Sequence, residues 1–169
     1  KYTTVILAHG GSITSDIHDT YYAPALADMG YVCFSYDVRG VVGSFGRSSY
    51  STNNAGVEAT LETYVNDANA ALAFVLAQPY VDQANLYMCG QSMGSVTTQV
   101  VTALNPDALR GTILLYGPIS ESRSQLGNYQ SMDLMTVLAT IKEKYNGETL
   151  FLMGADDTLA TYEDVLENA

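Results

Sequence analysis

Short runs of apolar residues recur along the whole chain, separated by stretches in which apolar residues follow a helical spacing. The apolar runs cover residues 4–8, 31–36, 85–89, 111–116 and 149–153. Most of them are continuous rather than alternating, which is typical of strands covered on both faces. Because strand-like and helix-like segments alternate along the chain, the sequence predicts an α/β fold with a mostly parallel sheet and crossover helices.

Three helices are predicted between these strands. The longest is indicated by apolar residues at three- and four-residue steps over 57–76, and Pro79 requires it to end. A second is expected over 22–29, followed by Gly30, a residue suited to the left-handed conformation after a helix end. A third is expected over 93–104. These helices would cover the sheet and fill the third layer of the fold.

A polar, serine-containing segment at residues 119–131 interrupts this alternation. At this point of a parallel sheet, an insertion commonly overhangs the carboxyl ends of the strands, where ligands bind. The pattern therefore predicts either a short lid or an ordinary solvated loop, and it leaves both open. The whole chain, 1–169, is predicted to be a single domain.

Composition narrows the class of protein. Of the 169 residues, 47% are hydrophobic, which is enough to fill the core of one domain. No apolar run approaches the roughly 18 residues that would cross a bilayer. With only 7 Lys and Arg and a net charge of -11, binding to nucleic acid or to an anionic membrane is disfavoured. The expected partner is a small molecule, and the oligomeric state is left open.

The cysteines and the first residue leave the compartment undetermined. Cys33 and Cys89 each lie in a strand-like run, so reduced core thiols are predicted, with a disulfide as the alternative. Lys1 begins almost directly on a strand, without an initiator Met or a signal segment. The sequence is therefore expected to be part of a longer chain. Two cysteines and two histidines without close spacing predict no metal site, and no cofactor is implied.

The chemistry is indicated by the segment Gly90-Gln91-Ser92-Met93-Gly94, which follows the strand at 85–89 and opens the helix at 93–104. Strand, Gly-x-Ser-x-Gly and helix in this order are the known signature of a nucleophile elbow. Such a turn strains the serine backbone, and glycines at both flanking positions avoid collisions. Ser92 is the predicted nucleophile, and the Met93 N–H a predicted oxyanion donor. A structural glycine-rich turn is the alternative.

Further residues after the other strands complete a pattern. His9-Gly10-Gly11 follows the first strand, where its loop can face the nucleophile. On these residues and the elbow, the chain resembles α/β-hydrolases of the feruloyl or cinnamoyl esterase and dienelactone-hydrolase-like branch. The remaining matching positions are Tyr21-Tyr22-Ala23-Pro24, Leu26, Gly30-Tyr31, Asp37-Val38-Arg39-Gly40, Gly43-Ser44, Asp67-Ala68 and Gly154-Ala155-Asp156-Asp157.

The resemblance implies roles for several residues. The second oxyanion donor falls on Gly11, and His9 is then structural, holding that loop by hydrogen bonding. Asp37 and Arg39 resemble a structural pair. Asp157 matches the acid of the catalytic triad, which would orient a histidine, with Asp156 as its close competitor. For either aspartate, a solvated turn residue after a glycine is the alternative.

The histidine of the triad is missing from the expected place. The resemblance puts it well beyond the acid, but only 169 − 157 = 12 residues follow Asp157 and none is His. His18, in the polar segment before the first helix, is expected to be a surface loop residue. The favoured explanation is a fold incomplete at both ends, lacking two strands before Lys1 and a strand with the histidine after Ala169. A second polypeptide supplying the base, or a protein that lost the chemistry, are the alternatives.

The expected function is a serine hydrolase that cleaves carboxylic esters through an acyl-enzyme. The resemblance implies hydroxycinnamoyl (feruloyl) or other small acyl esters as substrates. The alternatives are an inert ligand-binding protein of this fold that lacks the base, and an acyltransferase or peptidase of the same fold.

Overall fold

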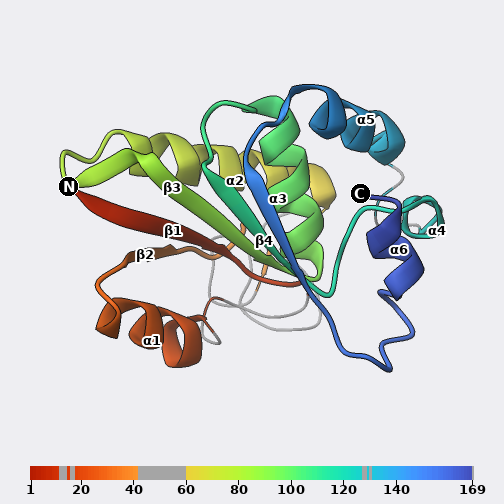
Figure 1. Ribbon diagram of the computed structural model, residues 1–169, viewed down its shortest axis with the longest axis horizontal. Helices are drawn as coiled ribbons and strands as arrows, with labels where there is room; N and C mark the ends of the chain where they lie inside the picture. Colours follow the sequence, from red (N-terminus) through yellow and green to blue (C-terminus); the bar gives the residue numbers. More distant parts are fainter. Residues whose placement is uncertain (12–14, 16–17, 42–59, 127–128, 130, 169) are drawn as a thin grey trace.

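Five parallel strands form the centre of the molecule in the computed structural model, which describes residues 1–11, 15, 18–41, 60–126, 129 and 131–168 (Figure 1). Their order is β2-β1-β3-β4-β5, and every neighbouring pair is parallel. This confirms the predicted α/β class. The strands are β1 (Tyr2–Ala8), β2 (Val32–Ser35), β3 (Val81–Gln91), β4 (Gly111–Leu115) and β5 (Glu148–Leu152).

The strand register brings the ends of the central strands to one level. Ala8, the last residue of β1, pairs with Gly90, and Gln91 pairs with Leu115 at the end of β4. Because parallel strands end at the same edge of a sheet, the loops that follow β1, β3 and β4 are neighbours. Each of the glycine-containing segments singled out in the sequence therefore begins at this edge.

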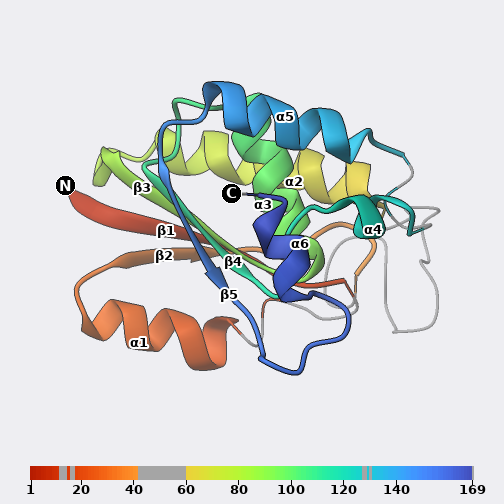
Figure 2. The ribbon, with the colours of Figure 1, turned by 45° about the vertical axis from the view of Figure 1, so that its right-hand side comes forward.

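Three helices cover one face of the sheet, and one short helix lies on the other (Figures 1 and 2). The first group is α2 (Leu61–Leu76), α3 (Met93–Leu104) and α5 (Leu134–Lys144), and the helix opposite is α1 (Ala23–Asp28). A π-helical turn, η1 (His18–Tyr22), leads into α1. The helix predicted over 93–104 is present with those ends, whereas the helices predicted over 57–76 and 22–29 are present with shifted ends, and Val57 lies outside the described residues.

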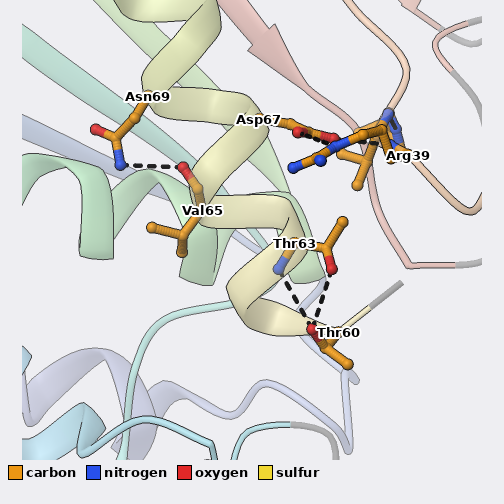
Figure 3. A network of polar contacts seen from close by, with 8 residues as sticks. Arg39, Thr60, Thr63, Val65, Asp67 and Asn69 are labelled. Atoms are coloured by element: carbon orange, nitrogen blue, oxygen red, sulfur yellow. Dashed lines mark hydrogen bonds and ion pairs between the residues drawn. The ribbon is translucent and has the colours of Figure 1, made fainter. Parts of the chain in front are cut away.

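The helix α2 starts where its first turn is capped. The Thr60 hydroxyl accepts a hydrogen bond from Thr63 N, which satisfies one of the free N–H groups of the turn (Figure 3). Asp67, in the next turns, accepts from Arg39 N and from Arg39 Nε at 2.8 and 2.7 Å. Arg39 therefore ties the loop after β2 to α2. The expected pair of Asp37 and Arg39 is wrong, because Asp37 Oδ1 instead accepts from Ser15 N at 2.7 Å.

The core lies between the sheet and the helices α2, α3 and α5. One cluster joins the sheet to α2 and α3, and a second extends it toward the segment after β4 and toward α5. Their fully buried members include Ile6, Leu86, Met88, Leu61 and Val96, with exposures of 0%. Burial of such side chains supplies about 1.5–3 kcal/mol each. These contacts fix the positions from which β3 and α3 approach one another.

Two short helices were not predicted from the sequence. They are α4 (Glu121–Ser124) and α6 (Tyr162–Leu166), which lie side by side at the carboxyl-end side of the sheet (Figure 2). Over its described part the segment 119–131 contains α4 and mixes exposed residues with four buried ones, which are Ile119, Ser120, Arg123 and Tyr129. Its role as a lid stays a prediction, and residues 127, 128 and 130 lie outside the described part.

The cysteines are both free and half-buried. They lie on β2 and β3 with β1 between them, and strands about 4.8 Å apart hold residues two strands away too far for a disulfide. Burial raises the pKa of the Cys89 thiol to about 12. Among the residues whose placement is described, no helix is long and apolar enough to cross a membrane, and no group of three metal-ligating side chains gathers.

Candidate active site

Ser92 occupies the turn between β3 and α3. Its backbone is left-handed, with φ 52° and ψ -113°, and only one other described non-glycine residue has a positive φ. Such a conformation costs about 1–3 kcal/mol and persists only where the surroundings impose it. Here Ser92 N donates to Leu115 O on the adjacent strand at 2.9 Å, and Ser92 O accepts from Ser95 N and Val96 N of α3. The turn is held from both sides.

The two glycines of the turn are required by close backbone packing. A Cβ on Gly94 would lie 2.1 Å from Ala8 O, and one on Gly90 would lie 2.1 Å from Gly94 O. The first turn of α3 thus lies directly against the end of β1. Any other residue at 90 or 94 would push strand and helix apart.

The loop after β1 lies beside the start of α3. A Cβ on Gly11 would be 3.6 Å from Met93 Cβ, so Gly11 and Met93 are neighbours although 82 positions separate them in the sequence. The N–H of the first residue of a helix has no partner inside the helix, and the helix dipole adds positive potential there. The structure therefore brings together three of the four predicted site residues, Ser92, Met93 and Gly11. Their catalytic roles stay predictions.

His9 holds this loop through hydrogen bonds from its buried imidazole. Its Nε2 accepts from Val38 N at 3.0 Å, and its Nδ1 lies 2.7 Å from Gly10 O, which assigns the proton to Nδ1. Tyr64 of α2 also donates to Gly10 O. Burial lowers the pKa of His9, only partly offset by the Gly10 carbonyl. A neutral imidazole with both nitrogens engaged is a structural residue, as the resemblance implied.

Asp157 lies on the loop after β5. Its Oδ1 accepts from Leu159 N at 2.8 Å and from Ala160 N at 3.0 Å. These backbone hydrogen bonds, with a smaller contribution from Arg123, lower the pKa of Asp157. Within the described part of the chain no hydrogen bond engages Oδ2, which leaves one oxygen able to orient another group. Asp156 is exposed, so only Asp157 is held in a defined orientation.

Asp157 is not joined directly to Ser92. The strand β4 lies between β3 and β5, and its end separates the two residues. A group that bridged them would lie over the carboxyl end of β4. Of the two histidines, neither hydrogen-bonds to Ser92 among the described contacts: His9 is engaged as above, and the His18 side chain lies beside that of Gln91.

The expectation that His18 is a surface loop residue is wrong. His18 is 1% exposed and lies in η1, with its ring 5.7 Å from the ring of Tyr22. Burial, reinforced by the nearby His9, lowers its pKa to about 4 despite the opposing effect of Asp19. The polar residues around it in the sequence gave no sign of this, because the packing of η1 under the sheet is a tertiary contact.

Two further residues at this edge were missed by the sequence reasoning. Gln91, next to Ser92, is buried, and its side-chain Nε2 donates to the hydroxyl of Tyr116. Tyr116 is the second non-glycine residue with a positive φ, 41°. It directly follows β4, so the two strained residues stand on neighbouring strands. The only sequence signal was its place before Gly117-Pro118, which marks the end of a strand.

Taken together, these features place the partly exposed Ser92 at the carboxyl edge of the sheet, with Met93 and Gly11 as neighbours from two different segments. Such an arrangement suits attack on a carbonyl carbon, because the amides can stabilise the negative charge that develops on its oxygen. The described side chains hold no set of ligands for a metal, and none of the contacts above depends on a cofactor.

Comparisons with known proteins identify the family and the fold. The family model described as Hydrolase_4, serine aminopeptidase S33, matches residues 2–131. Among curated proteins, none matches the chain in sequence.

Several solved structures share the fold. The structure of Est1E from Butyrivibrio proteoclasticus with bound ferulic acid superposes with a TM-score of 0.77 at 18% identity, covering 99% of this chain and 75% of that one. Acetyl xylan esterase 1 from a Thermoanaerobacterium species gives 0.70 at 20% identity, covering 99% and 64%. A putative dienelactone hydrolase from Klebsiella pneumoniae gives 0.70 at 18% identity, covering 99% and 67%. At these identities the likeness establishes the fold alone.

Proposed function

Because the chain belongs to the α/β-hydrolase family described as Hydrolase_4, serine aminopeptidase S33, we propose that it is a serine hydrolase that cleaves carboxylic esters through an acyl-enzyme. The observation that carries the proposal is the left-handed backbone of Ser92, between β3 and α3, with Gly11 and Met93 beside it. An ordinary strand-to-helix connection has no need of such strain.

In the proposed reaction, Ser92 Oγ attacks the ester carbonyl and loses its proton to a general base. The carbonyl oxygen gains negative charge, which the N–H groups of Met93 and Gly11 stabilise by hydrogen bonding. Collapse of this intermediate expels the alcohol, which takes up the proton, and leaves an acyl group on Ser92. Water then attacks the acyl-enzyme with the help of the same base, releasing the acid and restoring the hydroxyl.

The general base in this proposal is a histidine that the 169 residues do not supply at the required place. Asp157 would orient it, because Oδ1 is fixed by two backbone amides while Oδ2 has no hydrogen bond among the described residues. The lowered pKa of Asp157 keeps its carboxylate charged, as a group that stabilises an imidazolium must be. A base seated over the end of β4 would reach both Ser92 and Asp157.

The proposed substrates are small acyl esters, with hydroxycinnamoyl (feruloyl) esters as the first to test. Support comes from the similar fold of Est1E, whose structure holds ferulic acid, and of acetyl xylan esterase 1. The family description favours one second candidate, hydrolysis of a peptide bond at an amino terminus. Both reactions use the same acyl-enzyme, so aminoacyl amides belong in the same substrate panel as the esters.

A fluorophosphonate probe tests the proposal, because it reacts covalently only with an activated serine. We expect labelling of the full protein that disappears in Ser92→Ala, together with loss of ester hydrolysis by about 10⁴-fold or more. Ser95→Ala is the matched control: Ser95 lies on the same helix three positions on and is fully buried, so its loss should leave labelling intact. Labelling that survives in Ser92→Ala, or no labelling of the wild type, would contradict the proposal and favour a ligand-binding protein.

A further inference from the structure

Tyr116 directly follows β4, and its side chain lies on the opposite face of the sheet from the one that the alternation of β4 predicts. Side chains alternate along a strand, so residue 116 should share a face with Thr112 and Leu114, which line a small cavity against α3 and α5. Instead its hydroxyl bonds to Gln91. Gln91 shares the opposite face with Tyr87, two alternations earlier, and that face carries α1. The positive φ of 41° at Tyr116 is what turns the phenol across.

The turn that holds Tyr116 is fixed by contacts with its neighbours. Tyr116 N donates to Leu152 O of β5 at 2.8 Å. The next residue, Gly117, lies against the serine turn, since a Cβ there would be 2.5 Å from Ser92 O. A strained tyrosine costs about 1–3 kcal/mol, and it is kept here by packing that involves Ser92 itself. The backbone that positions Tyr116 and the backbone that positions Ser92 are therefore one unit.

The hydroxyl of Tyr116 has hydrogen-bond partners but keeps one hydrogen-bonding position free among the described contacts. A phenol has one donor hydrogen and two acceptor lone pairs. Gln91 Nε2 uses one lone pair, and the Tyr22 hydroxyl of η1 is a second hydrogen-bond neighbour. One position is left for a further group. The side chain is half-buried, and its residue follows the end of β4, at the same edge of the sheet as Ser92.

The amide that holds the phenol is itself placed by a buried neighbour. Gln91 and His18 are both more than nine-tenths buried, and the Gln91 side chain lies within hydrogen-bonding reach of the His18 imidazole. The side chain of Gln91 therefore connects Tyr116 at the end of β4 to His18 of η1. Buried polar side chains that contact one another in this way hold a fixed arrangement.

From this arrangement we propose that Tyr116 is a specificity-determining residue of the Ser92 site. Its hydroxyl, oriented by Gln91 and Tyr22, hydrogen-bonds to a hydroxyl or carbonyl oxygen that the substrate carries near the scissile ester. The inference rests on the proposed function. It narrows the substrate class to esters whose acyl group carries an additional hydroxyl or carbonyl oxygen, in preference to esters with plain aliphatic or aryl acyl groups. A site that hydrogen-bonds a substrate hydroxyl discriminates strongly against the analogue that lacks it.

The test compares matched nitrophenyl esters of acids that differ only by one hydroxyl, using the full protein. The ratio of kcat/KM for the hydroxylated ester to that for the plain ester is measured in the wild type and in Tyr116→Phe. The variant removes the oxygen and keeps the ring. We expect the ratio to fall by about 3–10-fold, the worth of one neutral hydrogen bond. Tyr21→Phe, at an exposed position one residue from Tyr22, is the control and should keep the ratio.

The outcomes separate this inference from the function on which it rests. Fluorophosphonate labelling of Ser92 with an unchanged ratio in Tyr116→Phe overturns the role of Tyr116 alone. A similar loss of activity on both esters indicates a purely structural residue and overturns it too. No labelling of Ser92 removes both proposals. If Tyr116→Phe does not fold, Gln91→Met releases the phenol from its amide partner and should lower the same ratio.

Discussion

At the scale of single residues, the serine turn depends on the absence of side chains at two positions. We expect Gly94→Ala to destabilise the protein by at least about 1–3 kcal/mol, since the new methyl would lie 2.1 Å from Ala8 O and neither backbone can yield freely. Urea unfolding measures the change. The control is Gly154→Ala, whose new methyl would come no closer than 3.8 Å to another atom. Equal stability of the two variants would contradict the packing described for α3 and β1.

The buried His18 makes stability depend on pH in a defined window. Its pKa is lowered from 6.5 to about 4 in the folded protein, so the unfolded chain binds the proton more readily between these values. The contribution of His18 to the free energy of unfolding is therefore fully present above about pH 6.5. It decreases as the pH drops toward 4, and below that pH it changes no further. The slope is at most about 1.4 kcal/mol per pH unit.

Unfolding by urea at several pH values between 7.5 and 4.5, spanning the lowered pKa of His18, tests this dependence. His18→Gln removes the titrating group and should flatten the curve relative to the wild type. Part of the slope should survive, because burial also lowers the pKa of His9. An unchanged slope in His18→Gln would mean that the imidazole is not buried in solution.

At the scale of elements, one aspartate both caps α6 and joins it to α4, while Glu167 and Asn168 at the other end of α6 add contacts to residues 119–121. Asp164 accepts from Thr161 N, and Thr161 Oγ1 accepts from Asp164 N, which forms a capping box. A second oxygen of Asp164 accepts from Ser122 Oγ of α4 at 2.8 Å. Burial raises the pKa of Asp164, but these hydrogen bonds outweigh it and the net pKa is lowered. The same carboxylate thus caps α6 and docks it on α4.

We expect Asp164→Ala to lower the free energy of unfolding by about 1–2 kcal/mol, because the loss of a helix N-cap interaction usually has an effect of this size. A substitution at an ordinary surface position changes stability less. Amide hydrogen exchange over residues 159–168 should be faster in this variant than in the wild type. Glu163→Ala, in the same first turn but exposed, is the control and should change little. If both variants exchange alike, α6 is not anchored through Asp164.

At the scale of the whole molecule, one face of the sheet is only partly covered. The helix α1 lies over the β2 side, whereas Leu150 and Leu152 of β5 are 52% and 49% exposed on that face (Figures 1 and 2). Contiguous exposed apolar surface binds hydrophobic dyes and promotes association. We expect the polypeptide of this sequence to bind the dye ANS in its folded state.

The variant Leu150→Lys with Leu152→Lys should weaken ANS fluorescence and any self-association in sedimentation, because two charges replace the apolar surface. Leu159→Lys provides the matched change at an isolated loop position that is 81% exposed. Equal effects of the two changes would show that the dye does not bind the sheet face.

The sequence by itself determined the features that depend on neighbouring residues. Strand and helix periodicity gave the parallel α/β fold, and the order of strand, Gly90-Gln91-Ser92-Met93-Gly94 and helix located the turn, because this order is contained in one continuous segment. Even so, α4 and α6 were missed, since four or five residues carry too little periodicity to predict a helix.

Only the tertiary structure decided which residues far apart in the sequence would meet. It buried His18 beneath the sheet, paired Arg39 with Asp67 instead of Asp37, and turned Tyr116 across the sheet to Gln91. Each outcome depends on contacts between segments far apart in the sequence: Arg39 and Asp67 are 28 positions apart, and Gln91 and Tyr116 are 25 apart. A local pattern records the preferences of a segment, whereas the free energy of these contacts exists only once the sheet and its helices have assembled.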